Sequence, residues 1–223
     1  MGNTDQTPVH DGFIFWTPVD KCIVEFLQAN LALHELARTN HLLLIATEGF
    51  GDTASALVPG AHVVECENRS YAKGNAALNY VRDRDFDYLV RTDTDAIMFD
   101  CDRVKKMVRA AIKPDAMVAA GVKYPPNCRV WYMRGACNAT ARALAKTLRL
   151  ICSESLGFDG AYTAAIHAAA GTIIDLPLFE INESYTGSAP VWHPKKCDGN
   201  GGLDRLLMFH ENMEKFGVLH GKH

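Results

Sequence analysis

Long apolar runs are absent from this 223-residue chain. No stretch reaches the roughly 18 consecutive apolar residues that a membrane-spanning helix needs. Residues 1–11 are polar and lack the basic and then apolar pattern of a secretory signal. We therefore expect a soluble, cytoplasmic protein with no membrane span in this chain, while an anchor in a longer natural chain stays open.

Paired cysteines and a basic surplus are absent as well. The seven cysteines are scattered without a CxxC pair, so we expect neither a structural zinc site nor a disulfide framework. This cysteine usage is typical of a protein in a reducing compartment. The net charge of -3 argues against a nucleic-acid partner. No GxxxxGK[ST] motif occurs, which excludes a P-loop nucleotide hydrolase.

What the chain does have is an alternation of strand-like and helix-like segments over residues 12–120. This order predicts an α/β fold with a mostly parallel central sheet flanked by helices. No proline-rich linker divides residues 1–223, so we expect a single domain behind a polar N-terminal arm at residues 1–11. The expected strands lie at residues 12–16, 41–46, 62–66, 88–91, 117–122 and 172–176. Long helices are expected at residues 20–37 and 139–151, and Asp102 and Asp159 are expected to be helix N-caps.

Two carboxylates separated by one residue are the most informative feature. Asp93 and Asp95 follow the apolar run 88–90 and precede a second apolar run, 96–99. Ligands of open α/β sheets bind at the carboxyl ends of the strands. Carboxylate oxygens suit Mg²⁺ or Mn²⁺, which such sites hold together with substrate phosphates. The pattern therefore predicts a metal and diphosphate site, and the alternative is a solvated turn after a strand.

A basic helix start precedes the acids by about twenty residues. A helix N-terminus favours the binding of phosphate, and Arg69 and Lys73 add two positive charges to this helix start. Gly74 is expected to let a ligand approach closely, and an ordinary solvated helix start is the alternative. With Thr17 at the end of the first strand and Thr94 between the acids, the candidate residues for binding a phosphate-bearing ligand are Thr17, Arg69, Lys73, Asn75, Asp93 and Thr94.

The order of these pieces, with Lys73-Gly74-Asn75 before the acids and segment 87–95 reading DYLVRTDTD, resembles the GT-A superfamily of nucleotide-sugar-dependent glycosyltransferases. The resemblance covers residues 12–180 in organisation, and only the DxD motif is specific. It implies a single GT-A-like, Rossmann-like domain with a nucleotide-sugar-binding half at residues 12–100 and an acceptor-side half at residues 101–223.

The resemblance also implies chemistry. Asp93 and Asp95 would bind Mn²⁺ or Mg²⁺, which holds the diphosphate of a nucleotide-sugar donor, with a UDP-sugar favoured. Asp95 would be a direct ligand, and Asp93 would contact the metal, its water or the ribose. The acceptor would be a hydroxyl of a glycan, a lipid or a protein.

A late histidine often completes the metal shell in such folds. His193 is the preferred candidate, and His210 and His220 are its rivals. The glycine-rich loop at residues 197–202 is expected to close over the donor and exclude water.

The helix after Asp159 lacks the acid that inverting relatives carry at its start, because residues 160–167 contain no carboxylate. We therefore favour a retaining transfer, with Asp159 as the candidate catalytic residue. Three other readings stay open. A haloacid-dehalogenase-like phosphatase would carry its DxD on the first strand, and a nucleotidyltransferase would carry a glycine-rich basic loop after it. A non-catalytic module would bind a sugar nucleotide or glycan without turnover.

Overall fold

A seven-stranded, mostly parallel sheet forms the centre of the computed structural model, which describes residues 11–124, 132–151, 157–182, 184–194 and 203–216. The strand order is β3-β2-β1-β4-β7-β6-β8, and β7 runs antiparallel to both of its neighbours. The strands are β1 (Phe13–Val19), β2 (His41–Thr47), β3 (His62–Cys66), β4 (Tyr88–Thr92), β6 (Val118–Tyr124), β7 (Tyr132–Ala141) and β8 (Thr172–Asp175). The expected single α/β domain with a mostly parallel sheet is confirmed.

A second, smaller sheet lies beside the carboxyl end of β4. Its order is β5-β10-β9, built from β5 (Ile97–Met98), β10 (Val191–Pro194) and β9 (Phe179–Asn182). β5 follows the two acids directly, and β10 pairs with it in antiparallel register. The chain segment after the acids is therefore joined to a segment almost 100 residues later.

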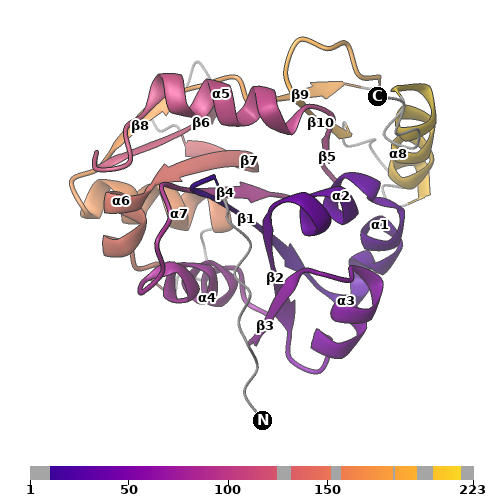
Figure 1. The fold of residues 1–223 in the computed structure, drawn as a ribbon, viewed down its shortest axis with the longest axis horizontal. Helices are drawn as coiled ribbons and strands as arrows, with labels where there is room; N and C mark the ends of the chain where they lie inside the picture. Colours follow the sequence, from indigo (N-terminus) through magenta and orange to yellow (C-terminus); the bar gives the residue numbers. More distant parts are fainter. Residues whose placement is uncertain (1–10, 125–131, 152–156, 183, 195–202, 217–223) are drawn as a thin grey trace.

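Helices cover both faces of the large sheet (Figure 1). They are η1 (Lys21–Ile23), α1 (Val24–Ala29), α2 (Leu31–Thr39), α3 (Gly51–Leu57), α4 (Ser70–Val81), α5 (Cys101–Ala111), α6 (Arg142–Thr147), α7 (Phe158–Ala168) and α8 (Leu203–Phe216). Among the described residues, none of these helices is long and apolar enough to cross a lipid bilayer.

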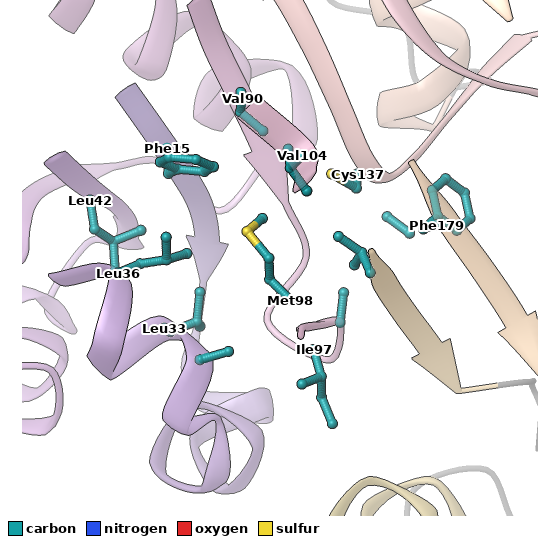
Figure 2. Packing of buried hydrophobic residues seen from close by; sticks show 14 of the residues in the cluster. Phe15, Leu33, Leu36, Leu42, Val90, Ile97, Met98, Val104, Cys137 and Phe179 are labelled. Atoms are coloured by element: carbon teal, nitrogen blue, oxygen red, sulfur yellow. The ribbon is translucent and has the colours of Figure 1, made fainter. Parts of the chain in front are cut away.

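The core consists of two layers because successive side chains of a strand point to opposite faces. In β1, Phe13 and Phe15 join the cluster under α1, α2 and α5, whereas Ile14 and Trp16 join the cluster under α4, α6 and α7. Figure 2 shows the first cluster, with Met98 of β5 among side chains from β1, α2 and α5. The loop between β4 and β5 thus sits on well-packed elements.

The helix expected at residues 139–151 is wrong in its first part. β7 continues to Ala141, and a shorter helix, α6, covers Arg142–Thr147. Residues Cys137 to Ala141 pair along β4, from Thr92 to Tyr88. The alanines favour a helix by propensity, and pairing with a buried central strand overrides that preference.

Two further expectations about helices need correction. The helix expected at residues 20–37 is divided at Asn30, which caps α2 through the backbone N–H of Leu33. The N-cap of α5 is Asp100, whose carboxylate accepts a hydrogen bond from Arg103 N, and Asp102 lies inside the first turn. In both places a side chain satisfies a free backbone N–H at a helix start.

Candidate active site

The loop that carries Asp93 and Asp95 is held by hydrogen bonds from neighbouring elements. The Thr94 hydroxyl donates to Pro18 O at 2.8 Å, and the Thr17 hydroxyl donates to Thr92 O. The Asn30 amide donates to Thr94 O at 2.9 Å and to Ala96 O at 2.8 Å. Because these side chains are buried, the two acids are fixed in place by the fold itself.

Three candidate ligands converge at this loop. One ligating atom from each of Asp93, Asp95 and His193 lies within 4.8 Å of the others, and the three side chains are partly buried. His193 Nε2 lies 3.4 Å from Asp95 Oδ1. The strand pairing explains this arrangement, because Trp192 pairs with Ile97 and the antiparallel register places His193 near the acids. Two carboxylates and an imidazole form a donor set that suits Mn²⁺.

Arg91, on β4, adds a buried cation to the acids. Its Nη2 lies 2.7 Å from Asp93 Oδ1, and its Nη1 donates a hydrogen bond to Asp159 Oδ1 at 3.1 Å. The approach of Arg91 to Asp93 is an ion pair without hydrogen-bond alignment. Within the part of the chain that the structure describes, the buried Asp93 Oδ1 therefore has no hydrogen-bond donor. A buried carboxylate oxygen in that state is a fitting ligand for a metal ion.

A cavity of about 220 Å³ opens beside Arg91. It contains two buried cations, because Lys73 and Arg91 are each 7% exposed. Lys73 Nζ donates to Val19 O at 3.2 Å and lies 3.5 Å from Asp20 Oδ2. The walls combine apolar and polar side chains from β1, η1, α4, β4 and α7: Trp16, Pro18, Asp20, Ile23, Asn68, Ser70, Lys73, Arg91 and Phe158.

The predicted donor-binding residues divide between this cavity and the surrounding framework. Lys73 lines the cavity. Arg69 lies at the N-cap of α4 and pairs with Glu67 at 3.1 Å on the surface. Thr17 and Thr94 are buried, and their hydroxyl groups bond to backbone carbonyls.

The expectation for Gly74 is wrong, because a packing contact occupies its open side. A Cβ there would lie 2.7 Å from Leu150 Cδ2 and 2.8 Å from Phe158 Cε2. The neighbouring Asn75 bonds to the same segment, since its amide donates to Leu150 O and accepts from Leu150 N, both at 2.9 Å. This part of the helix start therefore joins α4 to the segment after α6.

The expectation that Asp159 caps its helix is wrong as well. The N-cap of α7 is Gly157, and Asp159 lies in the first turn, where its carboxylate pairs with Arg91. His210 lies exposed on α8 beside Phe209 and outside the cluster of acids. His220 and the loop at residues 197–202 lie outside the described residues.

Sequence reasoning missed Arg91, although a signal was present. A charged residue in the otherwise apolar strand β4, two positions before the first acid, indicates a buried ion pair. Asn30 and Glu180 were missed too, and no local pattern marks them. The partners of Asn30 come from a distant segment, at Thr94 and Ala96. Those of Glu180 lie in the turn that follows its own strand, at Thr186 and Ser188.

Glu180 on β9 organises the turn that leads into β10 and His193. Its carboxylate accepts hydrogen bonds from the backbone N–H and hydroxyl groups of Thr186 and Ser188. Burial raises the pKa of Glu180, but the bonds from Ser188, Thr186 and Ala189 together outweigh burial and lower that pKa below its ordinary value. The ionised form is therefore the one that stabilises this turn.

Glu180→Gln should lower the free energy of unfolding at neutral pH by about 1–2 kcal/mol, because Thr186 and Ser188 lose a charged acceptor that is itself buried. A carboxylate with a depressed folded pKa stabilises above its unfolded pKa, and that stabilisation is lost as pH falls through the folded pKa. The difference between wild type and variant should thus shrink below about pH 4, near the pKa of a glutamate side chain in an unfolded chain. Urea unfolding at pH 7 and pH 3.5 measures this difference in the free energy of unfolding. An equal difference at both pH values would contradict the conclusion that the ionised carboxylate stabilises the turn.

Comparison with known proteins supports the fold. No known family profile and no curated protein sequence matches this chain. A solved cytidylyltransferase from Leptospira borgpetersenii serovar Hardjo-bovis superposes with a TM-score of 0.53 and 13% identity, over 75% of this chain and 76% of that one.

Two other solved structures are less similar. The bifunctional IspDF from Campylobacter jejuni gives a TM-score of 0.49 at 9% identity, over 74% of this chain and 49% of that one. A 4-diphosphocytidyl-2C-methyl-D-erythritol synthase gives 0.48 at 8% identity, over 73% and 88%. At 13% identity, the likeness to the Leptospira cytidylyltransferase confirms the predicted α/β fold alone, whereas sugar transfer remains a prediction. The chain therefore shares the fold of that cytidylyltransferase.

Proposed function

We propose that this protein is a metal-dependent transferase that uses a nucleotide diphosphate sugar, with a UDP-sugar favoured, and moves the sugar to a hydroxyl acceptor. The observation that carries the proposal is the convergence of Asp93, Asp95 and His193 within 4.8 Å, beside a cavity with two buried cations. A site of this composition suits a divalent cation together with a diphosphate. The acceptor hydroxyl belongs to a glycan, a lipid or a protein.

Asp93, Asp95 and His193 would hold Mn²⁺ or Mg²⁺. When bound, the ion offsets the charge that develops on the leaving diphosphate. Lys73 lies in the cavity wall and stabilises the same developing charge through its ammonium group. Arg69 stands at the exposed start of α4 and adds positive potential at the helix N-terminus.

Asp159 is the candidate catalytic carboxylate, and a retaining outcome is favoured. It is the one acid within α7, whose sequence is FDGAYTAAIHA. Arg91 holds its carboxylate at 3.1 Å, next to the cavity wall formed by Phe158. A carboxylate fixed in this way orients the sugar or the acceptor rather than moving freely.

Nucleotidyl transfer is the second candidate, and the fold of the cytidylyltransferase favours it. The segment after β1 opposes it. Residues 13–48 contain no glycine, and the 3-10 helix Lys21–Ile23 stands where a glycine-rich basic loop would be expected. The DxD motif follows β4, the fourth strand along the chain. This position argues against a haloacid-dehalogenase-like phosphatase, which would carry the motif on its first strand.

One assay separates these functions. The protein is incubated with Mn²⁺ and either UDP-, GDP-, ADP- or CMP-sugars, or the four nucleoside triphosphates with sugar phosphates. We expect one UDP-, GDP- or ADP-sugar to be hydrolysed, with water taking the sugar in place of the acceptor hydroxyl and a nucleoside diphosphate leaving, and we expect a chelator to abolish this release. Pyrophosphate release from CTP would establish the second candidate instead, and nucleotide binding without any release would establish a non-catalytic binding module.

A further inference from the structure

Arg91 is a buried cation shared by two carboxylates with different proposed tasks. Its Nη2 lies 2.7 Å from Asp93 Oδ1, and its Nη1 lies 3.1 Å from Asp159 Oδ1. The Arg91 side chain is 8% exposed, and the side chains of Asp93 and Asp159 are 24% and 31% exposed, so solvent screens these pairs only in part. Asp93 is a candidate metal ligand, and Asp159 is the candidate catalytic residue. One guanidinium thus touches both halves of the proposed site.

Packing keeps Arg91 between the two acids. Its guanidinium carbon lies 3.8 Å from the centre of the Phe158 ring and 5.7 Å from that of Trp16. On another side lies Gly135 of β7, where a Cβ would collide with both Arg91 Nη1 and Asp159 Oδ1. The guanidinium can therefore shift its pairing between the two carboxylates but has little room to leave them.

A divalent cation on Asp93 would repel Arg91, because like charges a few Å apart in a buried site interact strongly. Asp159 is then the carboxylate that remains as the ion-pair partner of Arg91. We propose that Arg91 is a positioning residue that couples metal binding at Asp93 to the placement of Asp159. The inference rests on the proposed function, because it presumes that Asp93 binds the metal. Coupling between two equilibria is reciprocal. The free energy by which the Arg91–Asp159 pair strengthens metal binding therefore equals the free energy by which the metal strengthens that pair.

Mn²⁺ affinity, measured with the metal alone by calorimetry, tests this coupling in wild type, Asp159→Asn, Arg91→Met and the double variant. We expect Asp159→Asn to weaken Mn²⁺ binding about fivefold or more, the lower end of usual couplings between sites. In the Arg91→Met background, the same change should alter the affinity less than about twofold. Equal weakening in both backgrounds would show a direct charge effect and overturn the coupling.

Gly135→Ala tests the same idea with every charge retained, which matters if Arg91→Met fails to fold. Its new methyl group cannot coexist with the present Arg91–Asp159 pair. We expect weaker Mn²⁺ binding in a variant whose circular dichroism matches wild type, and an unchanged Kd would overturn the coupling. Absence of Mn²⁺ binding to wild type would instead overturn the proposed metal site, so the two failures are distinguishable.

Discussion

Asp95→Ala should abolish Mn²⁺-dependent release of nucleotide from the sugar donor while the fold stays intact. Loss of a direct ligand removes about 4 kcal/mol of charge stabilisation, which corresponds to a roughly 1,000-fold lower rate. The free energy of unfolding should change by less than about 1 kcal/mol, since the 3.4 Å contact of Asp95 with His193 is an ion pair only when the imidazole is protonated. Product assays and thermal unfolding measure the two quantities.

Matched variants make the Asp95→Ala result specific. Asp85→Ala removes an exposed acid before the opposite end of β4 and should leave release unchanged. His193→Ala should weaken Mn²⁺ binding, whereas His210→Ala, on α8 and outside the cluster, should not. Full release by Asp95→Ala would refute the metal site, and equal effects of the two histidine changes would refute His193 as the third ligand.

Sequence reasoning located Asp93 and Asp95 because their signal is local. A buried strand that stops at two acids can be recognised without knowing what lies beside it. His193 was preferred over its rivals His210 and His220, but no local pattern could show that it lies near the acids. Its place there depends on pairing between β10 and β5, which brings Trp192 opposite Ile97. Such long-range pairing leaves no trace in the neighbouring residues.

Tertiary contacts also explain where the predictions from local sequence were wrong. Gly74 and Asn75 resemble a phosphate-binding helix start, yet the segment at Leu150 takes the hydrogen bonds of Asn75 and the space at Gly74. The alanines of residues 139–141 indicate a helix, yet they extend β7 beside β4. In each case a partner about 50 to 75 positions away along the chain decides the outcome.

Asn30→Ala should cause the largest loss of stability among single polar changes near the site. Asn30 is fully buried, donates to Thr94 O and Ala96 O, and caps α2 through Leu33 N. Truncation leaves two carbonyls without these donors, at about 1–3 kcal/mol each, and removes a cap worth about 1 kcal/mol. A loss of roughly 3–5 kcal/mol is expected by urea unfolding.

The same substitution should weaken Mn²⁺ binding, because Asn30 fixes the backbone between Asp93 and Asp95. Asn75→Ala is the matched control, since it also loses two hydrogen bonds to the backbone, but at Leu150 rather than at the acid loop. It should lower stability by about 1–2 kcal/mol and leave the Mn²⁺ affinity unchanged. An unchanged affinity in Asn30→Ala would show that the acid loop does not depend on this anchor.

Asn30→Asp separates the two tasks of the side chain. The carboxylate retains the acceptor for Leu33 N but turns a second oxygen toward the carbonyls of Thr94 and Ala96. Burial raises the folded pKa of such a group, so the variant should be least stable at neutral pH and should recover as pH falls. The protonated acid can donate one hydrogen bond, which restores part of the anchor. Equal stability of Asn30→Asp at pH 5 and pH 8 would contradict this arrangement, because it would mean that the carboxylate reaches solvent and the acid loop is held by other contacts.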